Sequence, residues 1–170
     1  LLGNESATAF YSYGTPLISS ANTGLELSNG LILFLYQDLN TNLVSLFLIA
    51  DVGNSGSGGS MQFETNCLPS TAFVSVQDDP GEFSGGPPSI TGNWSWTSCC
   101  TDGGVIEDIG CSNTINLDLL VASGLDSIVW LTGDMTNPTH ILLSMSGEAI
   151  TINCGGGICC PIGFDTDISI

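Results

Sequence analysis

The sequence predicts an all-β fold in which two antiparallel sheets pack as a sandwich. Short apolar or alternating runs recur along the whole chain, separated by turn residues at the spacing of about 8–12 residues that is typical of sandwiches. No segment combines a 3.6-residue apolar period with caps and with the length of a major helix. The strong helix formers lysine and arginine are absent altogether.

The first half of the chain contains five expected strands and two expected loops. The strands are residues 9–13, 31–37, 43–50, 61–65 and 72–77. Residues 31–37 and 43–50 flank the turn at 38–42, so we expect them to form a hairpin with a buried core. Residues 51–60 and 78–88 are rich in glycine, serine, asparagine or proline, which favours irregular loops.

The second half continues the pattern up to the last residue. The expected strands are residues 93–97, 114–121, 127–132, 141–145, 149–153 and 164–170. In the last of these, Phe164, Thr166, Ile168 and Ile170 share one face. With 170 residues the chain suits one domain, residues 1–170, of jelly-roll or immunoglobulin-like type, with few or no helices and with disulfide stabilisation.

Charge excludes several classes of function. The chain has 17 acidic residues, one histidine and neither lysine nor arginine, for a net charge of −17. Nucleic-acid binding requires basic residues to neutralise phosphates, and anionic membrane surfaces require them too. The apolar runs 31–36 and 43–50 are far shorter than the roughly 20 residues of a membrane-spanning helix, so we expect no membrane insertion.

Cysteine usage favours an oxidising compartment. Seven cysteines are the disulfide candidates: Cys67, Cys99, Cys100, Cys111, Cys154, Cys159 and Cys160. Adjacent cysteines in a strand point to opposite faces, so we expect Cys99 or Cys100 to pair with Cys111, and Cys154 with Cys159 or Cys160. The odd cysteine is then free or bonded to another chain. A metal–thiolate site at residues 154–160 is the weaker alternative, because no CxxC motif occurs.

The chain begins with leucine, which we interpret as a mature protein after removal of a targeting segment. We therefore expect an extracellular or cell-surface location. Two sequons, at Asn4 and Asn93, are compatible with secretion and with glycosylation.

Calcium is the most plausible bound ion, because hard oxygen donors are abundant and no cofactor motif is present. The candidate ligands are Asp78, Asp79 and Glu82 in one segment and Asp102, Glu107 and Asp108 in another. Neither segment has the EF-hand spacing. The alternative interpretation is that both are solvated acidic loops.

Catalysis is not expected. His140 has no GxSxG nucleophile elbow to accompany it, and acidic residues are too numerous to mark a glycosidase pair. Trp94 and Trp96 share one face of a short strand. They form either a sugar-stacking platform or, as their position beside Cys99 favours, part of the core.

Two segments carry a resemblance to a known family. Residues 94–106, WSWTSCCTDGGVI, and residues 127–134, SIVWLTGD, resemble parts of secreted bacterial β-sandwich proteins that the PEP-CTERM system sorts. The resemblance implies an exported surface or matrix component without catalysis. Residues 164–170 depart from it, because they contain no Pro-Glu-Pro motif. The expected architecture also resembles donor-strand filament and sheath subunits.

Sheet edges point to assembly. Lysine and proline normally protect the edge strands of soluble proteins, yet this chain has no lysine and its prolines fall mainly in loops. Residues 1–14 and 164–170 are terminal segments that either complete the chain's own sheets or pair with a neighbouring copy. The sequence thus predicts a homopolymeric structural subunit of an extracellular filament, sheath or surface layer. A calcium- or carbohydrate-binding module is the alternative.

Overall fold

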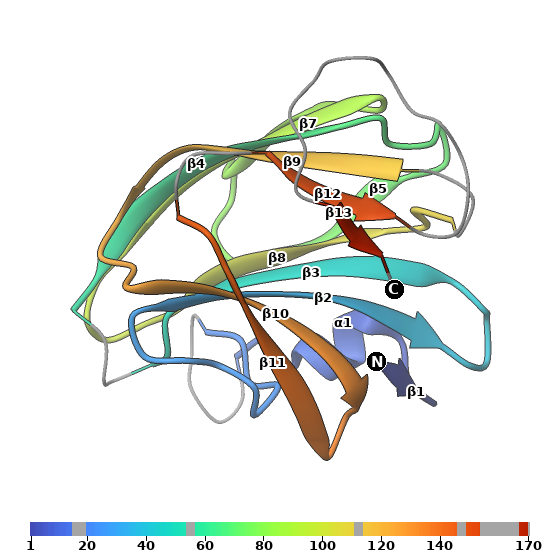
Figure 1. Cartoon of the computed structure of the whole chain (residues 1–170), viewed down its shortest axis with the longest axis horizontal. Helices are drawn as coiled ribbons and strands as arrows, with labels where there is room; N and C mark the ends of the chain where they lie inside the picture. Colours follow the sequence, from blue (N-terminus) through green and yellow to red (C-terminus); the bar gives the residue numbers. More distant parts are fainter. Residues whose placement is uncertain (15–19, 54–56, 111–113, 146–148, 154–166, 170) are drawn as a thin grey trace.

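The computed structural model describes residues 1–14, 20–53, 57–110, 114–145, 149–153 and 167–169. These residues form two mostly antiparallel sheets packed face to face, with one short helix on the outer side (Figure 1). The predicted all-β sandwich is confirmed. No helix in the described part of the chain is long and apolar enough to cross a membrane.

The first sheet has the strand order β11-β10-β2-β3-β8-β5, and β1 adds to β2 beside β10. Its strands are β1 (Leu2–Gly3), β2 (Gly30–Asp38), β3 (Val44–Ala50), β5 (Phe73–Gln77), β8 (Asp102–Glu107), β10 (Ser127–Asp134) and β11 (Asn137–Leu143). Strand β2 pairs in parallel with both β1 and β10, and every other pair in this sheet is antiparallel.

The second sheet has the order β13-β12-β9-β4-β7-β6. Its strands are β4 (Gly59–Asn66), β6 (Phe83–Gly86), β7 (Ser89–Trp96), β9 (Thr114–Ser123), β12 (Ile150–Asn153) and β13 (Asp167–Ser169). In the monomer β13 pairs in parallel with β12 of its own chain. The remainder of the predicted last strand, residues 164–166 and 170, lies outside the described residues.

The expected hairpin is confirmed as β2 and β3, with Phe34 opposite Phe47 in the register. Its turn is held by Asp38, whose carboxylate accepts hydrogen bonds from the Asn40 N–H at 2.8 Å and from the Thr41 hydroxyl at 2.9 Å. An Asp that binds the backbone two residues ahead is a common turn device, and here it sets the hairpin register.

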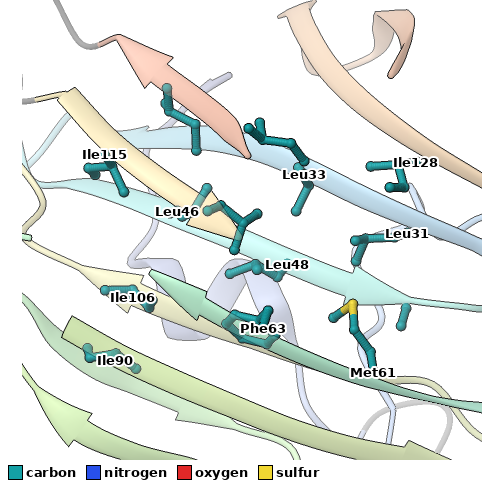
Figure 2. Close-up of a cluster of buried hydrophobic side chains, with 14 of the residues drawn as sticks. Leu31, Leu33, Leu46, Leu48, Met61, Phe63, Ile90, Ile106, Ile115 and Ile128 are labelled. Atoms are coloured by element: carbon teal, nitrogen blue, oxygen red, sulfur yellow. The ribbon is translucent and has the colours of Figure 1, made fainter. Parts of the chain in front are cut away.

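The main core lies between the two sheets. Leu31 and Leu33 of β2 and Leu46 and Leu48 of β3 point toward the side chains of β4, among them Phe63 (Figure 2). All of these side chains are buried. The alternating burial along β4 and β7 shows that these strands turn their other face outward.

A second core covers the outer face of the first sheet. Helix α1 (Ala7–Tyr11) lies against this face, where Phe10 stacks on Tyr36 and packs edge-on against Phe34 and Phe47. Strands β2 and β3 are therefore buried on both faces. This explains why their sequences are continuous apolar runs without alternation.

The predicted strand at residues 9–13 is wrong, because most of this segment forms α1. Ser6 caps the helix by accepting a hydrogen bond from the Ala9 N–H at 3.2 Å, and Ser12 ends it in a left-handed conformation. A helix of five residues has no measurable apolar period, so sequence periodicity could not reveal it.

Two strands were also missed. β6 lies inside the segment 78–88 that was expected to be an irregular loop, and β8 joins β3 to β5 in the first sheet. Both contain paired glycines, at Gly85-Gly86 and Gly103-Gly104, which disfavour a strand prediction. β7 also begins four residues earlier than expected, at Ser89 rather than Asn93.

Glycine packing offers a test of the sheet register. The ring of Phe63 on β4 lies directly over Gly92 on β7, and a Cβ at Gly92 would overlap it. We expect Gly92→Ala to lower the free energy of unfolding in urea by about 1–3 kcal/mol through overpacking. Gly86→Ala is the control, because a Cβ there meets nothing, and we expect a change below about 1 kcal/mol. Equal stability of the two variants would contradict this packing.

Candidate functional site

Three of the six predicted calcium ligands come together in an acidic cluster, which we define as Asp78, Glu82 and Asp102. Asp78 follows β5, Glu82 precedes β6, and Asp102 begins β8. Tyr11, the last residue of α1, faces all three carboxyl groups and is completely buried. Gly103 makes room for it, since a Cβ there would lie 2.6 Å from the Tyr11 hydroxyl oxygen.

The hydrogen bonds of this cluster are incomplete. Asp102 Oδ2 accepts the Ser95 N–H at 2.9 Å, and Glu82 Oε2 accepts the Asp79 N–H at 2.8 Å. Asp102 Oδ1 and both oxygens of Asp78 are inaccessible to solvent and have no hydrogen-bond partner of good geometry. Asp78 is 6% exposed and Asp102 is 2% exposed. Buried carboxylates in this condition are costly unless a proton or a cation neutralises them.

Burial and mutual repulsion both favour protonation. Burial raises the pKa of Asp78 to about 7, although the nearby Tyr11 hydroxyl opposes this rise. Burial, followed by the contact with the Glu82 carboxyl group, raises the pKa of Asp102 to about 9, and burial also raises the pKa of Glu82. Asp102 and Glu82 can therefore share one proton as a hydrogen-bonded acid pair.

The other predicted ligands lie elsewhere. Glu107 ends β8, the strand that Asp102 begins, and Asp108 follows Glu107 with a positive φ of 57°. Asp79 is adjacent to the cluster but exposed. Within the described residues, no three histidine, cysteine or acidic side chains form a group that could hold a metal ion. The first acidic segment thus supplies two residues of the cluster and the second supplies one. Asp78 and Asp102 differ from the other predicted ligands in being buried.

The disulfide differs from the expected pairing, because Cys99 bonds to its neighbour Cys100. Both follow the end of β7 in a turn, where the Cys100 N–H bonds to the Thr97 carbonyl at 3.1 Å. The expectation of opposite directions holds for strand residues only. Cys67 is buried, whereas Cys111, Cys154, Cys159 and Cys160 lie outside the described residues. A bridge between neighbours joins no distant segments, so it stabilises the sandwich less than the expected pairing would.

The two tryptophans belong to the core. Trp94 and Trp96 are buried between the sheets, and Trp96 Nε1 donates to Asp51 Oδ2 at 3.1 Å. They therefore offer no platform for a sugar ring. The sequon residues Asn4 and Asn93 are both exposed, as a glycosylated asparagine requires.

Exposed apolar residues at the edges of both sheets were missed by sequence reasoning. We define the edge patch as five exposed apolar residues of β9, β11 and the segment after β11: Leu120, Val121, Ile141, Leu142 and Met145. Among the described residues, β11 pairs with β10 only, and β12 covers β9 no further than Leu117. A groove of about 200 Å³ lies between β9 and Met145. Figure 1 shows the β10–β11 hairpin extending away from the sandwich.

A second edge lies at the other end of the first sheet. β5 ends this sheet and β6 ends the other, and a hollow of about 420 Å³ lies between them, which we call the β5–β6 groove. Phe73 at its rim is 48% exposed. The Oγ of Ser75, also in this lining, is buried and has no hydrogen-bond partner. No signal for this groove is present in the sequence, since strands elsewhere in the chain, such as β3 and β7, lack acidic residues as residues 72–77 and 83–90 do.

Comparison with known proteins does not assign the chain to a family. No family model matches it, and neither the curated proteins nor the solved structures give a match.

The acidic cluster predicts an unusual dependence of stability on pH. The folded-state pKa values of Asp78 and Asp102 lie above the unfolded value of about 3.9, so the folded state binds more protons than the unfolded state. We therefore expect the free energy of unfolding to fall as pH rises from about pH 4 to pH 7. Above the pKa of Asp78, only the Asp102–Glu82 pair sustains the decline, up to about pH 9.

Asp102→Asn tests this explanation. The amide cannot ionise but still accepts the Ser95 N–H, so we expect a flatter profile in denaturant titrations at pH 5, 7 and 9. Glu5→Gln removes an exposed carboxylate and serves as the control with the original slope. Parallel profiles for the wild type and Asp102→Asn would show that the cluster does not control stability.

Proposed function

We propose that this protein is a structural subunit of an extracellular filament, sheath or surface layer that assembles from copies of itself. One observation carries the proposal. The edge patch is apolar and lies on uncovered strand segments of both sheets, and residues 119–123 and 137–145 around it contain no acidic residue in a chain with a net charge of −17. Exposed apolar strand edges are the surfaces through which β-proteins associate.

Electrostatics favours this edge over other surfaces. Two copies of a chain with 17 acidic and no basic residues other than His140 repel each other over most of their surface. Association is least opposed where neutral segments meet. The edge also lacks the lysines that protect the edges of soluble monomeric proteins. Assembly would remove the exposed apolar area from water and supply partners for unpaired backbone groups.

Calcium binding is a second candidate function, and the unpartnered oxygens of Asp78 and Asp102 favour it. As described, these carboxyl groups do not form a group that could hold a metal ion. A calcium ion takes six to eight oxygen ligands, so binding would require Glu82 and Asp79 to move toward Asp78 and Asp102. Protons neutralise the same oxygens at lower pH. Calcium and protons are therefore expected to compete for this cluster.

The assembly proposal predicts concentration-dependent association of the purified chain. We expect sedimentation velocity to show species far larger than the monomer, and negative-stain electron microscopy to show filaments, tubes or sheets. Because salt screens repulsion, we expect the concentration needed for assembly to fall between about 0.01 M and 0.15 M ionic strength, where the screening length shrinks from about 30 Å to 8 Å. A single monomeric species at high concentration in both salts would refute the proposal.

The calcium proposal predicts saturable binding of one ion per chain in isothermal titration calorimetry at pH 8. We expect Asp102→Asn to abolish the binding and Glu5→Gln to retain it. Loss of binding cannot then be attributed to misfolding if Asp102→Asn in chelator unfolds at a temperature no lower than that of the wild type. If both variants give the same heat signals, calcium acts only as a general counterion, and the proposed calcium site is refuted.

A further inference from the structure

We propose that copies of this chain join head to tail, with β11 of one copy adding as a strand to the outer edge of β5 in the next. The inference rests on the proposed structural function and names its two surfaces. The first sheet would then continue from copy to copy, since β11 and β5 are the two ends of its strand order.

The donor strand β11 has no partner on its outer side among the described residues. Pro138 lies opposite Gly133 of β10, and its missing N–H removes one hydrogen-bond donor from this outer side near the start of the strand. Because backbone directions alternate along an antiparallel strand, the N–H groups of His140 and Leu142 also point outward. Leu142 is 73% exposed, the largest value among the exposed large apolar residues of the described chain. This strand therefore offers both hydrogen bonds and apolar area to a partner.

The acceptor is the β5–β6 groove. β5 spans five residues and, among the described residues, pairs with β8 on one side only, so the seven residues of β11 are long enough to cover its outer edge. The groove contains apolar surface from Phe73, Val74, Phe83 and Ile90. Ser75 adds a buried hydroxyl without a hydrogen-bond partner, which a backbone group of an added strand could satisfy.

The distribution of acidic residues favours a second copy of the chain as the occupant of the β5–β6 groove. Residues 72–77 and 83–90 of the acceptor contain no acidic residue, and neither does the donor segment 137–145. The acidic cluster lies beside the acceptor, at Asp78 and Glu82, so a strand that carried carboxylates would be repelled there. The β11 segment also contains His140, the only histidine of a protein that has neither lysine nor arginine.

Geometry favours a head-to-tail contact over a symmetric one. Pairing of β11 with β11 of a second copy around a two-fold axis would stop at a dimer and would leave the β5–β6 groove uncovered. Pairing of β11 with β5 leaves one unused β11 and one unused β5 at the ends of every assembly. Such a heterologous contact continues as an open filament unless the rotation closes a ring.

Two charge-introducing variants test the inference on the full chain. Leu142→Glu places a carboxylate on the donor, and Phe73→Glu places one at the rim of the acceptor. Leu39→Glu adds the same charge at an exposed apolar residue in the β2–β3 turn and is the matched control. Circular dichroism establishes that all three variants are folded. Sedimentation velocity then measures assembly of each variant and of a one-to-one mixture of the first two.

We expect each of Leu142→Glu and Phe73→Glu to raise the concentration needed for assembly more than about tenfold, since a glutamate buried at the contact without a partner opposes pairing. Leu39→Glu should assemble like the wild type. The mixture should form dimers and nothing larger, because the intact β11 of Phe73→Glu fits the intact groove of Leu142→Glu.

Other outcomes would overturn the inference in distinguishable ways. If Leu142→Glu blocks assembly and Phe73→Glu does not, β11 pairs with another surface, and the structural function survives without this contact. If both variants assemble like the wild type, neither edge joins the copies. If the wild type itself remains a monomer, the proposed function fails together with the inference.

Discussion

The lack of any lysine or arginine is the constraint on which the rest of this structure depends. Each buried carboxylate must be neutralised or hydrogen-bonded without a basic side chain. Asp51 shows the usual solution: it is fully buried and accepts hydrogen bonds from the N–H groups of Asn29 and Val52 and from the Trp96 ring. The carboxylate of Asp38 likewise accepts a backbone hydrogen bond, from the Asn40 N–H in its own turn. These carboxylates fix loops and register without ion pairs.

The acidic cluster is where this solution is incomplete. Asp78, Glu82 and Asp102 are brought together by the ends of three strands and by α1, and their hydrogen-bond donors are too few. Their raised pKa values are the consequence, since protons replace the cations that the chain lacks. The same shortage extends to the outer surface, where a charge of −17 leaves neutral sheet edges as the places where copies can meet. The absence of basic residues thus underlies both the raised pKa values of the acidic cluster and the proposed assembly.

Much of the fold could be predicted, because apolar periodicity is a property of consecutive residues. The β2–β3 hairpin and most strands of the second sheet follow from it, whereas the burial of Trp94 and Trp96 was the favoured one of two alternatives. Helix α1 is too short for a period, and the glycines of β6 and β8 weaken their strand signal. All three carboxylates of the acidic cluster were among the predicted ligands, but Asp102 was placed in a different segment from Asp78 and Glu82. Its union with them and with Tyr11 required the sheet order. The disulfide was misassigned because Cys99 and Cys100 lie in a turn rather than in a strand.

The sequence by itself determined the all-β class, the continuous apolar runs of the two most buried strands and a net charge of −17 without any lysine or arginine. These properties depend on composition and on neighbours along the chain. Only the tertiary structure decided which strands end each sheet, which carboxylates are buried together and which apolar residues stay exposed. Those properties depend on contacts between segments far apart in sequence, and burial, which sets both pKa and exposure, exists only after the sheets have packed.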